Sequence, residues 1–500
     1  MNYLSTRGGS GGLSSAEAIR FGIAPDGGLF TPECLPRLGR EALQAMLGLN
    51  YQELAVKILS GYLSDFSVTE LEAMVYAAYT HPAKWADARI TPVIPLDENQ
   101  YIIELFHGPT CAFKDVALQL LPYLMTKAGE MARDPNEMII LVATSGDTGK
   151  AALEGFKDVS GTRIIVFYPE QGVSDIQKLQ MMTQEGINTT VVGVHGNFDD
   201  AQTGVKRIFT DSAMIESLRK RRMSFSSANS INWGRLAPQI VYYFYGYLEL
   251  CRQGKLHCGD RLNVAVPTGN FGNILAAYFA KEMGLPLGKL ICASNSNNVL
   301  TDFIQSGTYS RNRPFHTTIS PSMDILISSN LERLLYYLAG ENPESVRHWM
   351  ERLKESGEYK VDPETAGRIK NQFASGFATE AETMATIRQV FSDTRYVLDP
   401  HTAVGKAVVE RYRQMSGDTA PVLIAATASP FKFNSAVIEA ISGAAAVQGL
   451  NEFQLLEKLQ LLSDTAIPAS LRLLAEKQIL HTEVCRVVQM QSVVSGILGV

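Results

Sequence analysis

The sequence lacks any long hydrophobic run, and this absence argues against a membrane-spanning protein. No stretch reaches the roughly eighteen consecutive apolar residues that a transmembrane helix needs. The chain opens without a basic segment leading into an apolar one, so we expect no secretory signal peptide. Lys and Arg number 45 against 51 Asp and Glu, a net charge of -6. This balance argues against nucleic acid or an anionic membrane surface as the main partner.

Cysteine is also scarce, with six residues in 500 and no paired CxxC spacing. The nearest approach to a metal site is Cys251, His257 and Cys258, which lacks a second cluster to complete the ligand set. We therefore expect no metal. The absence of a disulfide-like cysteine pattern favours a reducing compartment, the cytoplasm.

What is present is an alternation of short apolar runs and helix-length segments. Apolar residues make up 46% of the chain and charged residues 19%, as in an ordinary globular protein. Strands bounded by Gly, Pro or Asn and separated by helices predict an α/β fold with mainly parallel sheets. The predicted strands are 101–106, 138–143, 163–168, 189–194, 262–267, 289–293 and 421–426.

The flanking regions are predicted to be helical. Before residue 93, Ser14-Ser-Ala-Glu17 and Ser67-Val-Thr-Glu70 have the capping-box pattern, and 40–48 and 51–63 carry a helical period. The tail after about residue 446 also reads as helix, broken once by Pro468. The predicted division is a helical N-terminal domain (1–92), a smaller α/β domain (93–228), a large α/β domain (229–330 and 396–500) and a helical insertion (331–395).

Lys114 is the most informative single residue. It follows a loop closed by Gly108 and Pro109 and begins an apolar-periodic run, which places it in the first turn of a helix. The helix N-terminus disfavours a cation, and the neighbouring Ala112 and Phe113 would desolvate the amine, so its pKa should fall. An amine that forms a Schiff base needs that depression. The alternative is a solvated surface lysine.

Two glycine-rich turns follow predicted strands. Gly269-Asn-Phe-Gly-Asn273 comes directly before a helix, an arrangement that presents backbone N–H groups to an anion, although a tight turn without a ligand has the same pattern. Thr144-Ser-Gly-Asp-Thr-Gly149 is of similar design. It is not a Walker A loop, because Thr144 replaces the first glycine and Ala151 replaces the magnesium-binding hydroxyl. Open α/β sheets bind ligands at such strand ends.

Two further segments carry polar groups that could serve a ligand or only the fold. The buried-strand pattern from Val422 ends in the hydroxyls of Thr427 and Ser429, which could be simple end caps. The segment Ser226–Arg235 packs many donors around one cation, Arg235. It could bind an anionic substrate or form a polar loop before a helix.

These motifs together resemble those of the threonine synthase family, in its longer form, within the tryptophan-synthase-β-like (fold type II) pyridoxal-phosphate enzymes. The resemblance covers nearly the whole chain and implies two open, mainly parallel α/β sheet domains. The motifs that carry it are Ser5-Thr-Arg7, Ala24-Pro-Asp-Gly-Gly-Leu-Phe30, His107-Gly-Pro-Thr110, Phe113-Lys-Asp115, Thr144-Ser-Gly-Asp-Thr-Gly149, Asn229-Ser-Ile-Asn-Trp233, Pro267-Thr-Gly-Asn-Phe-Gly-Asn273 and Asp399-Pro-His-Thr-Ala-Val-Gly405.

The resemblance implies a role for each matching residue. Lys114 matches the catalytic lysine that carries pyridoxal 5'-phosphate, Asp147 matches a contact to the cofactor's phenolic oxygen, and Thr427 matches a hydroxyl facing the pyridine nitrogen. Ser429 stands where many relatives carry His, so either hydroxyl could face that nitrogen. The implied phosphate cradle is Gly269, Asn270, Phe271, Gly272 and Asn273. The predicted substrate-binding residues are Ser145, Thr148, Asn229, Ser230, Asn232 and Arg235.

The implied activity is a lyase reaction that converts O-phospho-L-homoserine and water to L-threonine and phosphate by γ-elimination and β-addition. The nearest alternative is a related phospho-lyase that releases 2-oxobutyrate, and no motif separates the two. A non-catalytic scaffold on the same fold is a further alternative, against which Lys114 and both glycine-rich turns argue. The resemblance points to a monomer.

Overall fold

Two β-sheets form the framework of the protein, which is described here from a computed structural model over residues 1–144, 146–170 and 173–500. The large sheet has the order β13-β10-β9-β14-β4-β3 and the small sheet the order β15-β7-β6-β5-β8. All neighbours are parallel except β3 and β4. The large-sheet strands are β3 (Val93–Asp97), β4 (Gln100–Glu104), β9 (Leu262–Pro267), β10 (Leu287–Ser294), β13 (Phe373–Phe377) and β14 (Val422–Ala426).

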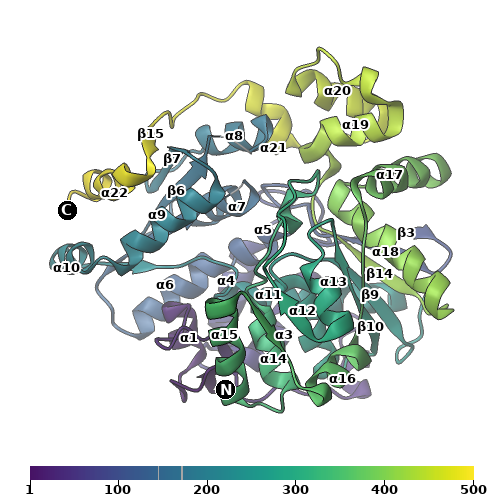
Figure 1. Cartoon of the computed structure of the whole chain (residues 1–500), viewed down its shortest axis with the longest axis horizontal. Helices are drawn as coiled ribbons and strands as arrows, with labels where there is room; N and C mark the ends of the chain where they lie inside the picture. The colour runs from purple at the N-terminus through teal and green to yellow at the C-terminus, as the bar shows by residue number, and fades with distance from the viewer. Residues whose placement is uncertain (145, 171–172) are drawn as a thin grey trace.

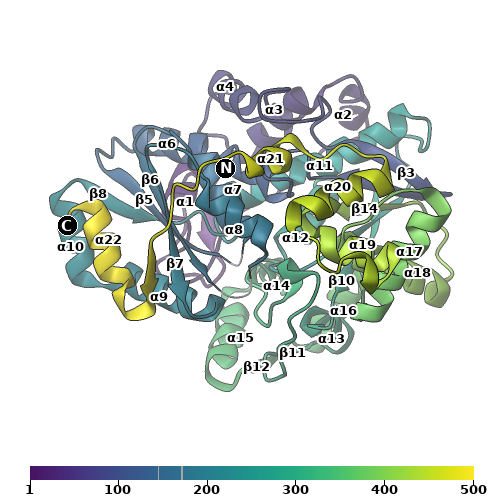
Figure 2. The same ribbon diagram turned by 90° about the horizontal axis from the view of Figure 1, so that it is seen from above.

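The small sheet and two short strand pairs complete the β structure. The small-sheet strands are β5 (Glu137–Ala143), β6 (Thr162–Pro169), β7 (Thr189–His195), β8 (Met223–Ser226) and β15 (Val484–Arg486), and the pairs are β1 (Tyr3–Ser5) with β2 (Phe30–Pro32) and β11 (Thr308–Ser310) with β12 (Glu358–Lys360). In Figures 1 and 2 the two sheets lie in separate lobes, and the chain from α21 (Ala469–Arg472) returns across the molecule to the small sheet.

The helices cover both sheets. In the N-terminal half they are α1 (Ser15–Phe21), α2 (Arg40–Ala45), α3 (Tyr51–Tyr62), α4 (Val68–Ala78), α5 (Lys114–Leu118), α6 (Leu121–Met131), α7 (Asp147–Phe156), α8 (Asp175–Met182), α9 (Phe198–Thr210), α10 (Ser212–Lys220) and α11 (Trp233–Arg252). In the C-terminal half they are α12 (Gly272–Glu282), α13 (Val299–Ser306), α14 (Leu331–Leu338), α15 (Pro343–Ser356), α16 (Pro363–Gln372), α17 (Glu380–Thr394), α18 (Pro400–Ser416), α19 (Asn434–Ser442), α20 (Glu452–Ser463) and α22 (Met490–Leu498). Short 3-10 turns lie at η1 (Pro321–Met323) and η2 (Pro430–Phe433).

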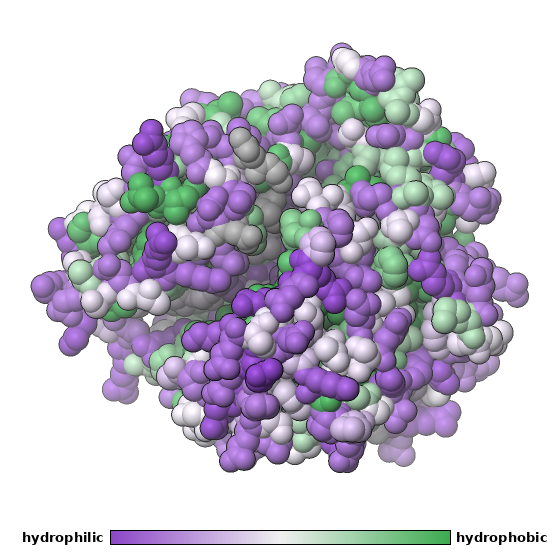
Figure 3. Space-filling model, in the orientation of Figure 1, coloured by the Kyte–Doolittle hydropathy of each residue, from purple (hydrophilic) through white to green (hydrophobic). Residues whose placement is uncertain are grey.

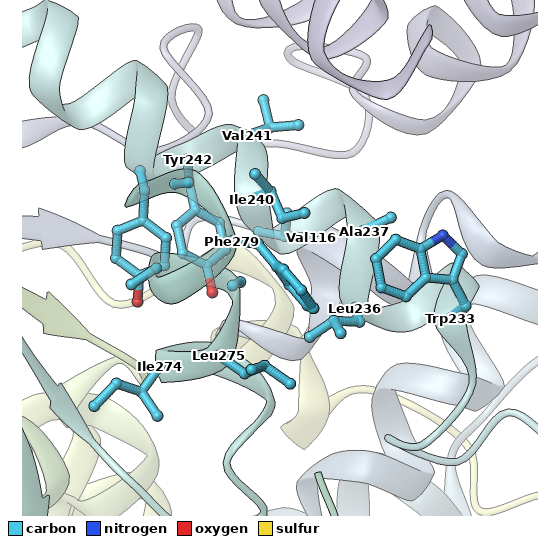
Figure 4. Close-up of a cluster of buried hydrophobic side chains, with 14 of the residues drawn as sticks. Val116, Trp233, Leu236, Ala237, Ile240, Val241, Tyr242, Ile274, Leu275 and Phe279 are labelled. Atoms are coloured by element: carbon cyan, nitrogen blue, oxygen red, sulfur yellow. The ribbon is translucent and has the colours of Figure 1, made fainter. Parts of the chain in front are cut away.

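Helix α11 forms the centre of the main core. Its side chains are buried on nearly every side, and it packs against α3, α5 and α12. Trp233 meets Phe279 edge to face at 5.6 Å between ring centroids, beside Val116 and Leu275 (Figure 4). Because α5 is held against this helix, the position of Lys114 is fixed by packing rather than by its own short helix. None of the described helices has the length and hydropathy needed to cross a membrane.

All seven predicted strands are present, as β4, β5, β6, β7, β9, β10 and β14. Both predicted capping boxes are confirmed at α1 and α4. The helical reading of the tail is only partly correct. After α20 and the short α21 the chain runs largely non-helical to β15, because residues 484–486 pair with β7.

The predicted domain boundaries need three corrections. Strands β3 and β4, assigned to the smaller domain (93–228), lie in the large sheet. Strand β13, placed in the insertion (331–395), also belongs to the large sheet, and β15 belongs to the small one rather than to the large domain (396–500). The reason is that sheet membership follows long-range pairing, which neighbouring sequence does not encode.

Candidate active site

The candidate site lies where the carboxyl ends of three large-sheet strands, β4, β9 and β14, meet the carboxyl end of β5. Parallel strands bring the segments that follow them to one edge. The Lys114 loop is tied to the end of β14, since Phe113 N donates to Thr427 O at 2.8 Å and Ser429 N donates to Cys111 O at 3.0 Å. Figure 3 shows the face between the two lobes as hollowed.

Lys114 begins α5, as predicted. Its Nζ lies 3.2 Å from Ser322 Oγ and 3.5 Å from Asp147 Oδ2. Burial lowers the pKa of the Lys114 amine, and the nearby cations Lys432 and Arg235 lower it further, while Asp147 opposes them. The predicted lowering of the Lys114 pKa is therefore confirmed in direction. Its main cause is burial together with two neighbouring cations, so that a larger share of the amine is neutral and available as a base or nucleophile.

Asp147, the first residue of α7, is the anion of the site. Its Oδ1 is 2.5 Å from Lys432 Nζ and accepts a hydrogen bond from Gln177 Nε2 at 2.8 Å. Although burial favours the neutral form, the ammonium groups of Lys432 and Lys114 hold the pKa of Asp147 well below its ordinary value. The carboxylate therefore stays ionised between two lysines and links the small-sheet helix to the turn η2 of the large domain.

Lys432 was not among the residues predicted from the sequence. Its side chain is fully buried and its Nζ also donates to Thr110 O at 3.0 Å, within the loop that precedes Lys114. The available signal was a lysine placed between two aromatic residues, Phe431 and Phe433, just after the strand-ending Ser429-Pro430. A cation in such an apolar setting requires a buried partner.

Ser322 and His401 were also missed. Ser322 Oγ accepts from Lys114, and its backbone N–H donates to His401 Nε2 at 3.2 Å. The other ring nitrogen lies 2.8 Å from Asp399 Oδ1. Since Nε2 accepts, Nδ1 carries the proton toward Asp399. The resemblance had included the Asp399-Pro-His401 motif without giving His401 a function; the structure places it behind the segment that contacts Lys114.

The turn Gly269–Asn273 joins β9 to α12, as predicted. Phe271 adopts a left-handed conformation (φ +64°) directly before α12, whose first N–H groups, like those of any α-helix, have no carbonyl of their own helix to bind. A Cβ on Gly269 would lie 2.5 Å from Ser322 O, so only glycine permits this approach. The turn and the Ser322 segment are thus packed into one unit.

Asn273 carries an unused donor at the start of α12. Its Oδ1 accepts from Tyr242 OH at 2.7 Å and also from Tyr243 OH. Its buried Nδ2 has no partner among the described residues. Because two phenols fix the amide orientation, Nδ2 is left for a group outside the chain, and an unsatisfied buried donor costs about 1–3 kcal/mol.

Thr427 and Ser429 differ in what their hydroxyls do. Ser429 Oγ caps η2 by accepting from Phe431 N at 3.4 Å. The Thr427 hydroxyl makes no hydrogen bond within the described part of the chain, although its side chain is buried at the end of β14. Of the two hydroxyls, Thr427 is the one left for a ligand.

Arg235 is a buried cation in the first turn of α11. Its guanidinium donates to Ala228 O at 3.0 Å, and its Nε has no partner in the described structure. Burial lowers its pKa to about 10, and no described carboxylate lies within 4.0 Å of it. A buried guanidinium without a counter-charge is a site for an external anion.

Of the remaining predicted substrate residues, three have positions that allow substrate binding, one does not, and one is not described. Asn229 and Ser230 lie in the loop before α11, and Thr148 is half-buried in the first turn of α7. Asn232 is corrected: its Oδ1 caps α11 at Gly234 N (2.8 Å) and its Nδ2 donates to Ile19 O (2.9 Å), which leaves neither end of the amide for a substrate. Ser145 lies outside the described residues.

These groups fit pyridoxal phosphate. Lys114 would supply the amine, the Gly269–Asn273 turn and Asn273 Nδ2 would supply donors for the phosphate, and Thr427 would supply a hydroxyl. The described residues bring together no group of three or more His, Cys, Asp or Glu that could hold a metal ion.

Comparison with known proteins agrees with this reading. Residues 87–428 match the family described as "Pyridoxal-phosphate dependent enzyme", residues 2–79 match "Threonine synthase N terminus" and residues 402–488 match "Threonine synthase, C-terminal". Threonine synthase from Pseudomonas aeruginosa is 38% identical over 450 residues, which cover 89% of this chain and 91% of that relative. Threonine synthase-like 1 from Homo sapiens is 41% identical over 91% of this chain, but the chain spans only 61% of its length.

Two solved structures have the same overall fold. The crystal structure of PLP-bound threonine synthase from Brucella melitensis has a TM-score of 0.87 at 37% identity, covering 100% of this chain and 98% of that one. Threonine synthase from yeast has a TM-score of 0.88 at 33% identity, covering 100% and 99%. The fold and the lysine site define a pyridoxal-phosphate-dependent enzyme of fold type II, and the predicted α/β fold class is confirmed. Within that class, the chain belongs to the threonine synthase family.

Proposed function

We propose that this protein converts O-phospho-L-homoserine and water to L-threonine and inorganic phosphate. The observation that carries the proposal is Arg235, a buried cation with a free Nε and no carboxylate partner in the described residues, close enough to Lys114 to lower its pKa. A phosphorylated substrate would supply the missing anion beside the reactive amine. Membership of the threonine synthase family gives the same answer from independent observations.

Pyridoxal phosphate, when bound, supplies the electron sink for this chemistry. Lys114 would hold it covalently, and the Gly269–Asn273 turn with Asn273 Nδ2 would hold its phosphate. Asp147 was predicted at the phenolic oxygen. Because that carboxylate is ionised, it would repel an anionic oxygen by itself, so we assign the contact to Asp147 together with the ammonium of Lys432.

Substrate binding is divided between the two lobes. Arg235, with Asn229 and Ser230 nearby in sequence, would bind the substrate phosphate. Thr148, in the first turn of α7, would bind the substrate carboxylate, which the positive end of a helix favours, together with Ser145 as predicted from the sequence. The neutral amine of Lys114 would take the proton from the substrate Cα and return it later, which its lowered pKa permits at neutral pH.

A product assay tests the proposal. Full-length protein supplied with pyridoxal phosphate is incubated with O-phospho-L-homoserine, and phosphate, threonine and 2-oxobutyrate are measured. We expect threonine and phosphate in equal amounts, with activity lost by several orders of magnitude in Lys114→Ala and retained in Lys127→Ala, a helix-surface lysine paired with Glu70. Release of 2-oxobutyrate without threonine would instead assign the phospho-lyase activity.

We propose Thr427 rather than Ser429 as the partner of the pyridine nitrogen, because Ser429 is used as a cap. Thr427→Val and Ser429→Ala each remove one hydroxyl, and the cofactor absorbance of the two variants is compared with that of the parent. A spectral change in Ser429→Ala alone would reverse the assignment.

We further propose that the enzyme acts as a cytoplasmic monomer. The six cysteines, which are all free thiols, support the reducing cytoplasm, and the resemblance to the threonine synthase family supports the monomer. Size-exclusion chromatography with light scattering checks the oligomeric state.

A further inference from the structure

A cavity lies beside the Lys114 loop, apart from the candidate active-site residues. It has a volume of about 700 Å³, and its walls come from both lobes: Pro109 and Cys111 of the loop, Glu154 of α7, Gln180 of α8 and Leu474 of the C-terminal segment. None of the candidate active-site residues Lys114, Asp147, Asn273 and Arg235 lines it. The volume is within the range of small-molecule sites. The cavity is therefore separate from the proposed substrate site, although it shares the loop that carries Lys114.

Gln180 gives the cavity a polar specificity. Only 1% of this residue is exposed, and both its Nε2 and its Oε1 lack a partner in the described structure. Burying a whole amide unpaired is costly, so native proteins rarely retain one without a ligand or water to satisfy it. This lining residue therefore carries unpaired N–H donors and an unpaired carbonyl acceptor beside the cavity. Its complement is a ligand that carries an acceptor and a donor on neighbouring atoms.

The charges around the cavity favour an anionic acceptor. Four cations line it, namely Lys84, Lys150, Lys477 and Arg395, against the two carboxylates Glu104 and Glu154. Glu104 is already engaged by His107 at 2.7 Å and by Tyr396 at 2.6 Å, and Glu154 pairs with Lys150 at 3.0 Å. Lys477 in turn lies 3.7 Å from Glu185, so Lys84 and Arg395 are the two lining cations without a carboxylate partner in the described structure, and their charge is free to attract a carboxylate. The remaining wall is largely apolar, with Trp85, Phe106, Phe431, Ile467, Pro468 and Leu474.

We propose that this cavity binds a small α-amino acid with an apolar side chain. The α-carboxylate would accept from Gln180 Nε2 and be attracted by Lys84 and Arg395, the α-ammonium would donate to Gln180 Oε1, and the side chain would lie against the aromatic and aliphatic wall. Because the wall includes Cys111 and Ser429, which are hydrogen-bonded to each other beside Lys114, occupancy would alter the position of the reactive loop. The site is thus suited to an effector, and the inference does not depend on the identity of the substrate.

Calorimetry on the holoenzyme tests the proposal. The enzyme is first reduced with borohydride, so that an amino acid cannot react at Lys114. It is then titrated with L-leucine, L-isoleucine, L-methionine and L-phenylalanine. We expect saturable binding of at least one of them at one site per chain. The half-ligands 4-methylpentanoate and 3-methylbutylamine, which lack the ammonium and the carboxylate of leucine, should each bind at least tenfold more weakly than leucine if leucine binds.

Three variants locate the binding. Gln180→Leu should weaken it by about ten- to a hundredfold. Gln119→Leu is the matched control: Gln119 is also 1% exposed with an unpartnered Nε2, but it does not line the cavity, so binding should be unchanged. Ala469→Trp fills the cavity from an exposed position and should abolish binding even if Gln180→Leu fails to fold. Absence of saturable binding by all four amino acids, equal binding of either half-ligand, or binding that survives Ala469→Trp would overturn the proposal.

Discussion

At the residue scale, the site depends on how buried cations share one carboxylate. Lys432 and Lys114 both face Asp147, and the ammonium group of Lys432 lowers the pKa of Lys114. Lys432 has no exposed surface, so its charge acts on Lys114 with little screening by solvent. The reactivity of Lys114 is therefore set partly by a residue more than three hundred positions away in the chain.

This arrangement predicts a pH effect. In Lys432→Met the pKa of Lys114 should rise, because one of the cations that depress it is gone while Asp147 remains. A larger share of the amine would then be protonated at neutral pH, so the acidic limb of the pH profile of kcat/KM should move to higher pH. The profile is measured for both proteins. An unchanged or downward-shifted acidic limb would show that Lys432 does not tune Lys114.

The same variant should lose stability, since removal of one partner of a buried ion pair typically costs about 3–5 kcal/mol. Lys406→Met is the control: Lys406 is also a buried lysine, paired with Asp97 at 3.1 Å and Glu410 at 2.5 Å, but it lies on α18 outside the site. It should lower stability without moving the pH profile. Urea unfolding of both variants separates the two effects.

Arg235 makes a second prediction at this scale. Arg235→Met keeps most of the side-chain volume and removes the cation, so binding of O-phospho-L-homoserine should weaken by about ten- to a hundredfold, while binding of L-homoserine should change little. Dissociation constants are read from the cofactor spectrum. Arg333→Met is a control, because Arg333 is equally buried but donates to Phe30 O at 2.9 Å and to other groups of the fold. Arg333→Met should lower stability and leave the ratio of the two dissociation constants unchanged. If Arg235→Met weakens binding of both ligands equally, the substrate phosphate binds elsewhere.

At the element scale, local sequence predicted the parts of the site that one segment forms by itself. The strand–turn–helix at Gly269–Asn273 and the helix start at Lys114 both follow from glycine and apolar periodicity. Lys432 and Ser322 reach the site through long-range packing: the aromatic neighbours of Lys432 indicate only that it is buried, and nothing in the Ser322 segment marks that residue. Strands β8, β13 and β15 were missed for a related reason: each is short, and each exists because it pairs with a neighbour distant in sequence.

The cradle turn gives a prediction with an internal control. Gly269→Ala would place a Cβ 2.5 Å from Ser322 O, so the turn and the Ser322 segment must separate. A Cβ on Gly272 would meet its nearest neighbour, Asn330 Nδ2, at 3.5 Å, which is an ordinary contact. We expect Gly269→Ala to weaken pyridoxal phosphate binding at least tenfold and Gly272→Ala to weaken it much less, as measured by titration of the apoenzyme. The reverse order would contradict the assigned packing.

At the scale of the whole molecule, the C-terminal segment completes the small lobe. β15 pairs with β7, and α22 packs against α9. Val494 of α22 is fully buried in the cluster that contains Val192 and Ile208. The end of the chain therefore stabilises the small sheet, whose strand β5 leads to Asp147 at the start of α7. The preceding strand β14 belongs to the large sheet, and α18 packs against that sheet.

Val494→Asp tests this division. A carboxylate in that cluster would be buried without a partner, a cost of several kcal/mol that falls on the small sheet alone. Hydrogen exchange should accelerate for the amides of β6 and β7, while β9 and β14 keep their protection. Val488→Asp is the control, because Val488 is 82% exposed and a charge there remains in water. Because Asp147 and Lys432 join the two lobes, Val494→Asp should also lower activity. Equal acceleration of exchange in both sheets would mean that the lobes unfold as one unit. Exchange rates in Val494→Asp that match those in Val488→Asp would show that the C-terminal segment does not contribute to the core of the small lobe.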